Sequence, residues 1–432
     1  MSVWSPAVRY RVPDRTQVSA VSLDEQLPDP HPARSIWAFV TRLDLSAFVR
    51  PSKAVAGHPG PDVIPASLLF ALWLFALTDG IRSARRLAEL CTRDLPYQWL
   101  CGGRPVNYHT LADFYARHGD ALRAQFVEHI AALRAQELID LWQVTVDGRK
   151  VPANAAKGSF HRAPTLQAHL QEARDHLGRL DAQAEDEGAG ARQTAARRRA
   201  AGERVRRLEA AVAQVQRRQQ ARHQAKRKDR AAEEARASET DPDAAKMKLS
   251  DGGYRPAYNV ETVTAESSGL IVQVSVTNQG SDNGQLGPQL GQLEQRHQIP
   301  PGVALVDSGF ADQRDLEQAE RAGVLVLMPP RDRRRDEQAG RDPYRRKKRD
   351  SDAVAAWRAR MGTAEAQRQY RRRAPVAEGV HAQQANRGWR RFRLRGLTKV
   401  QTEAVWQALA HNVARLLAWG VDLSATVRAA AG

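Results

Sequence analysis

The stretch VTVDGRKV, residues 144–151, decides how the middle of the chain is interpreted. Its valines and threonine favour a pleated, half-buried strand, whereas the Asp and Gly at positions 147 and 148 do not. Because the apolar alternation stops there, we expect the strand to end at Asp147. An acid at the end of a strand either caps a turn or takes part in chemistry, so Asp147 is a candidate site residue.

A second strand pattern ends in the same way. In VALVDSGF, residues 303–310, an apolar run stops at Asp307, which Ser308 and Gly309 follow. Ligand sites of open α/β sheets lie at strand ends, so the carboxylates of Asp147 and Asp307 converge if the two strands are neighbours. Two converging carboxylates repel each other unless a cation lies between them. Mg²⁺ prefers such hard oxygen ligands, and two ions roughly 4 Å apart suit in-line phosphodiester displacement.

A third acid completes this set. Glu378 opens the helical pattern EGVHAQQANRGW, residues 378–389, which follows the last strand pattern. Taken singly, each acid has a structural explanation, because Asp-Gly is a common turn and a Glu at a helix start complements the helix dipole. Their joint occurrence in a strongly basic chain favours a catalytic and metal-binding site made of Asp147, Asp307 and Glu378.

Composition points to an anionic partner. The chain has 432 residues, enough for two or three domains, and 66 Lys and Arg against 49 Asp and Glu leave a net charge of +17. Nucleic acid is the commonest partner of such a chain, and an anionic membrane is the competitor. The longest apolar run, residues 67–77, is shorter than the roughly 20 residues that cross a bilayer, so we expect a buried helix there.

Location is also constrained. The N-terminal residues have no apolar core behind their charges, which argues against a secretory signal. Two cysteines, Cys91 and Cys101, cannot form a disulfide framework. We therefore expect a cytoplasmic, nucleoid-associated protein with no membrane partner.

Residues 30–140 have helical patterns separated by turn signals. SARRLAELC (83–91) and YHTLADFYARHG (108–119) predict two short helices joined by a turn, as in a helix-turn-helix that places one helix in the major groove. The alternative is a helical scaffold whose arginines form a solvated face, and the Cys and His spacing matches no zinc finger. The DNA-binding candidates in this region are Arg82, Arg85, Arg86, Tyr108 and His109.

Residues 164–236 have a near-heptad apolar repeat. Leu166, Leu170, Leu177 and Leu180 form a first run, Gly188 and Gly190 interrupt it, and a second run continues with Val205, Leu208, Val212 and Val215. The pattern predicts a helical hairpin of coiled-coil type. Its face rich in Arg and Gln either follows a phosphate backbone or is merely solvated.

From residue 141 onward, with this insert set aside, the predicted order is strand, strand, strand, helix, strand, helix, strand, helix. The charged tract at 331–350 looks too charged to pack, and we expect a loop. The predicted elements lie at 141–147, 253–265, 269–278, 283–297, 303–307, 312–323, 324–328 and, at the end, the helices 378–389 and 402–419.

Several stretches resemble the DDE transposases of bacterial insertion sequences, over nearly the whole chain. They are GHPGPDVIPASLLFALWLFALTDGIRSARRLAEL (57–90), NYHTLADF (107–114), VDGRKVPANAAK (146–157), DGGYRPAYNVE (251–261), LVDSGF (305–310) and LTKVQTEAVWQALAHNVARL (397–416).

The resemblance implies an α/β fold, a ribonuclease H-like mixed sheet flanked by helices, with an all-α N-terminal domain and a helical-hairpin insertion. The expected organisation is an N-terminal tail (1–29), a helical DNA-binding domain (30–140), a DDE catalytic domain (141–163 and 251–420), the hairpin insertion with its linker (164–250) and a basic loop (331–352).

The resemblance also implies roles. Asp147, Asp307 and Glu378 correspond to the metal-binding triad, with Mg²⁺ or Mn²⁺ as cofactor, and Tyr370 and Arg373 to residues that precede the catalytic Glu. Arg149, Lys150, Tyr370 and Arg373 join the nucleic-acid-binding candidates. Water would cut the phosphodiester at the element's inverted-repeat end, and the freed 3′-hydroxyl would attack target DNA in the same pocket. A homodimer in the DNA complex is expected.

Two alternatives stay open. Arg373 precedes Glu378 by five residues rather than four, and Ala385 stands where relatives have Lys or Arg, although Arg387 is near. A catalytically inactive, transposase-derived DNA-binding protein is therefore the first alternative. An RNA-directed nuclease of ribonuclease H-like fold is the second.

Overall fold

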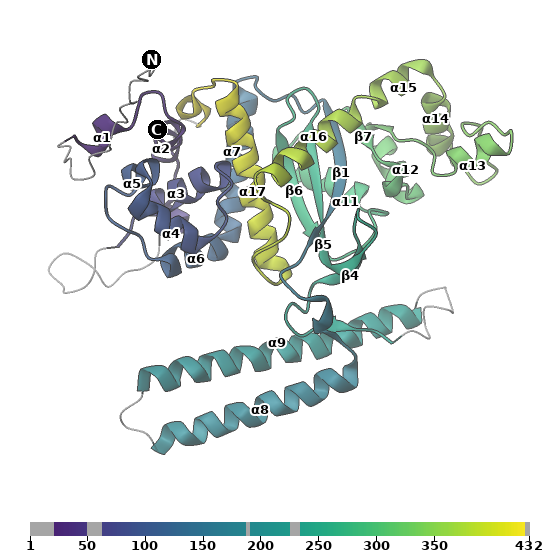
Figure 1. Ribbon diagram of the computed structural model, residues 1–432. Coiled ribbons are helices and arrows are strands. Elements are labelled where there is room, and N and C mark those ends of the chain that lie inside the picture. The colour runs from purple at the N-terminus through teal and green to yellow at the C-terminus, as the bar shows by residue number, and fades with distance from the viewer. Residues whose placement is uncertain (1–20, 50–62, 187–190, 225–233, 428–432) are drawn as a thin grey trace, which may run out of the picture.

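The computed structural model describes residues 21–49, 63–186, 191–224 and 234–427. Three sequence features discussed above lie outside these ranges: the N-terminal residues 1–20, the GHPGPD segment at 57–62, and the glycines at 188 and 190. In the described part, a helical region and a mixed sheet lie side by side, and a long helical pair lies below the sheet (Figure 1).

The described residues up to 140 are mainly helical, as predicted for residues 30–140, but there is one more helix than expected between the two short patterns. That extra helix is α5, which starts one residue after Asp94 with a Pro in its first turn. The helices are α1 (Leu23–Gln26), α2 (Pro32–Val40), α3 (Ala66–Thr78), α4 (Ala84–Arg93), α5 (Leu95–Leu100), α6 (Tyr108–Arg117) and α7 (Gly119–Ala135), with the short turn η1 (Ser46–Phe48).

Helix α3 is the buried helix that the apolar run predicts. Residues 69–77 are all buried, and the Trp73 indole N–H donates to the Leu111 carbonyl at 2.9 Å, so even the polar atom of this side chain has a partner inside the core. Among the described residues, no helix is long and apolar enough to cross a membrane. The cysteines at 91 and 101 are both buried and free.

The sheet is mixed, with strand order β4-β5-β1-β7-β8 and β6 paired with β5. β1 pairs antiparallel with β5 on one side and parallel with β7 on the other, and β7 pairs parallel with β8. The strands are β1 (Gln143–Pro152), β4 (Ala245–Lys248), β5 (Tyr254–Ala265), β6 (Ile271–Thr277), β7 (Val303–Val306) and β8 (Leu325–Leu327).

The predicted end of the first strand is wrong. β1 does not end at Asp147 but continues to Pro152. Its pairing with β7 stops at Val146, whereas its pairing with β5 continues to Pro152, with Gly148 opposite Glu261. The neighbouring long strand therefore keeps the backbone extended where the side-chain pattern alone predicts a break.

Helices follow the later strands as predicted, except that two of them, at 352–361 and 364–370, were not expected. They are α11 (Leu286–His297), α12 (Gln313–Arg321), α14 (Asp352–Met361), α15 (Ala364–Tyr370), α16 (Arg373–Asn386) and α17 (Leu397–Ala418), with the short turns η3 (Ser308–Phe310) and η4 (Leu423–Thr426).

Helix α17 connects the two halves of the molecule. It packs against α3, α6 and α7 of the helical region and against β6 of the sheet (Figure 1). On the helical side, the Trp406 ring stacks on Tyr115 with centroids 5.8 Å apart. On the sheet side, the Asn412 amide exchanges two hydrogen bonds of 2.8 Å with the backbone of Ile271. One helix thus contributes to both sides of a single apolar core.

The predicted helical pair is present. α8 (Ala163–Asp186) and α9 (Ala191–Gln224) pack against each other and extend away from the sheet (Figure 1). Their contact is a separate apolar cluster that includes Leu166, Leu170 and Leu208. A two-stranded sheet of β2 (Phe160–His161) and β3 (Ala237–Ser238), next to the turn η2 (Lys157–Ser159), joins the pair to the rest of the chain.

The charged tract at 331–350 is not simply a loop. It contains α13 (Arg333–Gln338), and two of its acids are buried. Asp336 pairs with Arg341 and Lys347, and the guanidinium of Arg358 donates to Asp350 at 2.7 Å. The sequence-based prediction overlooked that charges can be packed when each carboxylate has a cationic partner.

A buried ion pair joins Arg82, in the segment just before α4, to Glu403 on α17. Arg82 donates to Glu403 and to the carbonyls of Gly388 and Arg391, at 2.8 and 2.9 Å. Glu403 also accepts from the backbone N–H groups of residues 393 and 394. Burial raises the pKa of Glu403 despite the opposing charge of Arg82. Both side chains are buried, so neither can lose its partner without a large desolvation cost.

We expect Arg82→Ala to lower the free energy of unfolding by about 3–5 kcal/mol, because it leaves the Glu403 carboxylate buried without its cation. Urea denaturation of the full chain measures this loss. The matched control is Arg86→Ala, which removes an exposed pair with Glu89 and is expected to cost less than about 1 kcal/mol. Equal effects of the two substitutions would contradict a structural role for the buried pair.

Candidate active site

The two aspartates are brought together by strand register. β1 and β7 are parallel neighbours in which Val146 pairs with Val306. Asp147 and Asp307 directly follow these paired residues, so the two acids lie at the same end of the paired strands. Paired strands lie about 4.8 Å apart, so the two acids start from adjacent backbone positions. The condition on which the sequence-based argument for convergence rests, that these two strands are neighbours, is thus met.

Asp147 is held by two cationic or potentially cationic side chains. The guanidinium of Arg373 donates to Oδ1 of Asp147 at 2.6 Å, and Nε2 of His381 lies 2.9 Å from its Oδ2. Both partners belong to α16, which packs on β1. Burial alone would raise the pKa of Asp147, but the His381 hydrogen bond and the charges of Arg373 and His381 outweigh it and lower that pKa. The carboxylate is therefore held in its ionised form.

Asp307 is less constrained. It is half-buried, follows β7 directly and precedes η3, and the Ser308 hydroxyl lies 3.4 Å from its Oδ1. Tyr370, the last residue of α15, is close to both aspartates. Burial raises the pKa of Tyr370, as do the charges of Asp307 and Asp147, against the opposing charge of Arg373. The phenol thus remains protonated and available as a hydrogen-bond donor beside the two acids.

Glu378 is on the same helix as the Asp147 partners, but it does not open that helix as predicted. α16 begins at Arg373, so Glu378 lies in its second turn, where it is exposed. It precedes His381 by three residues, and residues at this spacing are neighbours on one helix face. Because His381 contacts Asp147, Glu378 is about one helical turn from that contact.

Two further acids, which the sequence analysis missed, lie at this edge. Glu261 on β5 is fully buried, and Asp282 is half-buried in the segment between β6 and α11. The amide of Asn259 donates to both carboxylates at 2.6 Å. Burial, followed by the charges of Asp282 and Asp147, raises the pKa of Glu261 to about 8. A Glu inside an otherwise continuous buried strand pattern is the signal that marks this residue.

The glycines after the two predicted acids leave space for these carboxylates. A Cβ on Gly148 would lie 2.7 Å from Asp282 Oδ1 and 2.9 Å from Glu261 Oε2. A Cβ on Gly309 would lie 3.4 Å from Asp282 Oδ2 and 3.8 Å from Asp307 Oδ2. The carboxylates of residues 261, 282 and 307 thus surround the two glycines, beside Asp147.

This arrangement fits a divalent cation. Oε2 of Glu261 is buried and has no hydrogen-bond partner in the structure, and such an orphaned carboxylate oxygen is costly. The oxygens around Gly148 and Gly309 are hard ligands of the kind that Mg²⁺ and Mn²⁺ take. The residues present are thus of the chemical type that the expected cofactor takes, although no three of their ligand atoms lie within 4.8 Å of one another in this structure.

The remaining candidates near the strand edge, Arg149 and Lys150, are both half-buried on β1. The Arg149 guanidinium lies over the Trp389 ring, 4.8 Å from its centroid, and donates to the His381 carbonyl at 3.3 Å. Burial, with the charge of Arg82, lowers the pKa of Arg149 to about 10. Lys150, next along β1, is half-buried. Arg149 thus supports α16 through its bond to the His381 carbonyl.

The predicted DNA-contacting residues of the helical region divide into two groups. Arg82 is buried in its pair with Glu403 and does not form part of a surface. The others gather where α4 and α6 begin: the Arg85 guanidinium lies 5.1 Å from the Tyr108 ring centroid, and the Tyr108 and His109 rings are 4.0 Å apart. Arg85, Arg86 and His109 are exposed. We call Arg85, Arg86, Tyr108 and His109 the α4–α6 patch.

Comparisons with known proteins identify two segments of the chain. Residues 21–117 match a family model described as Transposase domain (DUF772), and residues 334–417 match one described as Transposase DDE domain. The second segment contains Glu378, Arg373 and Tyr370, whereas Asp147 and Asp307 lie outside both. No match was found among curated proteins or among solved structures.

We expect Gly148→Ala to destabilise the protein by about 1–3 kcal/mol, as overpacking of a tight site does. The new methyl group would meet Asp282 and Glu261, which cannot withdraw without breaking their bonds to Asn259. Thermal unfolding measures the effect, with Gly158→Ala as the control because its Cβ would meet nothing within 4 Å. An unchanged melting temperature in Gly148→Ala would show that the carboxylates do not crowd this position.

Proposed function

Because the two matched segments together indicate a DDE transposase of the insertion-sequence type, we propose that this chain cleaves DNA strands and transfers them to target DNA. Asp147, Asp307 and Glu378 are its catalytic and metal-binding carboxylates. The observation that carries this proposal is the pairing of Val146 with Val306, which sets the two aspartates side by side. The contact of α16 with β1 adds the helix that bears Glu378.

The strand arrangement supports a catalytic domain of ribonuclease H-like type, made of residues 141–163 and 251–420. Three consecutive antiparallel strands, β1, β5 and β6, are followed by parallel strands β7 and β8 on the other side of β1. The helical region up to residue 140 is then the DNA-binding domain, and residues 164–250 form an insertion between the first two long strands.

The triad and the acids beside it are suited to hold Mg²⁺ or Mn²⁺. When bound, such ions activate an attacking hydroxyl and stabilise the leaving oxygen of a phosphodiester. Asp282 adds negative charge beside Glu261, and Glu261, whose pKa is raised, has one oxygen without a hydrogen-bond partner. We therefore include Glu261 and Asp282 among the residues that shape the cation site.

Arg373 and His381 have a distinct role. In this structure they contact both oxygens of Asp147 and compensate its charge. A carboxylate that ligates a cation no longer needs these partners, so both side chains become available beside the strand edge. A DNA phosphate is the group that a released guanidinium would bind there, since Arg and phosphate form charge-assisted hydrogen bonds. Arg373 and Tyr370 thus position the strand to be cut.

The partners follow from the reaction. The DNA is the inverted-repeat ends of an element and a target site, and two ends must be brought together, so we expect a homodimer in the DNA complex. The net charge of +17 supports DNA as the partner.

Asp147→Asn, Asp307→Asn and Glu378→Gln are each expected to lower DNA cleavage by at least about a hundredfold, the order seen when a group that stabilises developing charge is removed. The assay uses the full chain, Mg²⁺ and a plasmid that carries the DNA flanking its reading frame, with nicked and linear products quantified on a gel. DNA binding, measured by mobility shift, is expected to remain, because the backbone and the α4–α6 patch are unchanged.

The control is Glu294→Gln, which removes an exposed acid on α11 and is expected to cleave normally. Wild-type protein that binds the flanking DNA but does not nick it in Mg²⁺ or Mn²⁺ would favour the inactive DNA-binding protein instead. Cleavage of RNA–DNA hybrids but not of duplex DNA would favour the nuclease alternative.

The α4–α6 patch is expected to contact DNA phosphates. Arg85→Ala and Arg86→Ala should each weaken binding and reduce the slope of log affinity against log salt by about 1, as loss of one phosphate contact does. Fluorescence anisotropy over a salt series measures both quantities. Arg93→Ala, at the other end of α4, is the matched control. An unchanged salt slope in Arg85→Ala and Arg86→Ala would mean that this face is only solvated.

A further inference from the structure

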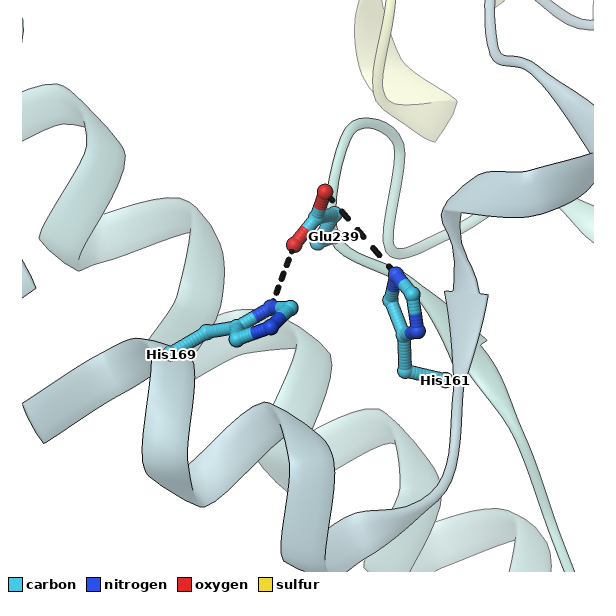
Figure 2. A group of neighbouring side chains, drawn as sticks. All are labelled: His161, His169 and Glu239. Atoms are coloured by element: carbon cyan, nitrogen blue, oxygen red, sulfur yellow. Dashed lines mark hydrogen bonds and ion pairs between the residues drawn. The ribbon is translucent and has the colours of Figure 1, made fainter. Parts of the chain in front are cut away.

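Three side chains meet where the helical pair joins the rest of the chain. His161, His169 and Glu239, here called the junction cluster, point toward one another from separate segments (Figure 2). His161 ends β2, His169 is in the second turn of α8, and Glu239 directly follows β3. The cluster thus links the segment that leads into the pair with the segment that returns from it.

The distances within the cluster are those of a set of ligands that can close on one ion. His169 Nδ1 lies 2.9 Å from Glu239 Oε2, and His161 Nε2 lies 3.9 Å from Glu239 Oε1. One ligand atom from each residue lies within 4.8 Å of the other two. Around a tetrahedral zinc ion, ligand atoms are about 3.4 Å apart, so small side-chain rotations bring these three into place.

We propose that the junction cluster binds one Zn²⁺ ion. Two imidazoles and one carboxylate are a known zinc ligand set, in which water completes the coordination. The side chains are 26%, 31% and 33% exposed, so the cluster is open to solvent and a water molecule can reach the fourth position. Imidazole nitrogen favours Zn²⁺ over Mg²⁺, which separates this site from the carboxylates at the strand edge.

A simple ion pair accounts for only part of the cluster. Glu239 can neutralise His169 at hydrogen-bonding distance, but 3.9 Å is too long for a hydrogen bond from His161. The two imidazole rings nevertheless lie 5.2 Å apart in an edge-to-face arrangement, each directed at a different oxygen of the one carboxylate (Figure 2). A cation gives both imidazole lone pairs a common partner.

The backbone around the cluster is already ordered for such a role. The hydroxyl groups of Ser159 and Ser238 hydrogen-bond at 2.7 Å, and the Glu239 N–H donates to the Ser159 carbonyl at 2.9 Å. Bound zinc would add a cross-link between β2, α8 and the segment after β3. The ion would then fix the direction in which α8 and α9 leave the sheet, without taking part in DNA cleavage.

The test is zinc binding by the full chain after treatment with a chelator and dialysis. Isothermal titration with ZnCl₂ in the presence of excess Mg²⁺ should show one site per chain with a Kd of about 1 µM or tighter. His161→Gln, His169→Gln and Glu239→Gln should each weaken this site by at least about tenfold. Co²⁺ should give visible absorption bands of a four- or five-coordinate site in the wild type, and these bands should be lost in the three variants.

His176→Gln is the matched control, because His176 is exposed on the same helix two turns further on. It should bind zinc as the wild type does, and so should the Asp147→Asn, Asp307→Asn double variant. Circular dichroism checks that each variant is folded. If a His variant does not fold, the isosteric Glu239→Gln still tests the site. Two results would overturn the proposal. In the first, the wild-type protein binds no zinc in the presence of excess Mg²⁺. In the second, the zinc site is retained in folded His161→Gln and Glu239→Gln.

Discussion

The parallel pairing of β1 with β7 is the constraint on which the site depends. Its register sets Val146 opposite Val306, so the next residue of each strand is an aspartate at the same edge. A shift by one residue would turn one of the two carboxylates to the other face of the sheet, because side chains alternate along a strand. The antiparallel pairing with β5 on the other side of β1 fixes that register further and brings Glu261 opposite Gly148. Backbone hydrogen bonds, more than side-chain contacts, thus determine where the acids meet.

Several acids at one place need compensation, and the chain provides it in three ways. Asp147 has Arg373 and His381 as partners, Glu261 and Asp282 share the amide of Asn259, and the pKa of Glu261 is raised to about 8 so that part of the charge is removed. Each is a response to the same electrostatic cost of converging carboxylates. A divalent cation bound at this edge would compensate the same negative charges.

Much of this could be predicted from the sequence, because the signals are local. The apolar runs before residues 147 and 307, the continuous apolar run of α3 and the near-heptad leucines of α8 are all such local patterns, and each element is present. What failed depends on distant partners. β1 continues past Gly148 because β5 pairs with it, and Arg82 is buried because it pairs with Glu403, 321 residues later. The packing of Asp336 has a local cause instead: its partners Arg341 and Lys347 lie in the same tract, and the charge content of that tract does not show that they close around one carboxylate. Glu261 and Asp282 join the site through sheet topology, which no local spacing encodes.

Helix α17 affects the order in which parts of the chain can fold during synthesis. Phe70 of α3 and Tyr115 of α6 both pack on Trp406, so the helical region lacks one side of its apolar core until residues 397–418 have been made. Domains usually fold as soon as they emerge. Here α3 and α6 cannot bury that surface until α17 has been synthesised, and a product that stops before α17 would expose apolar surface and be a target for proteolysis. Folding of the helical region therefore depends on synthesis of α17.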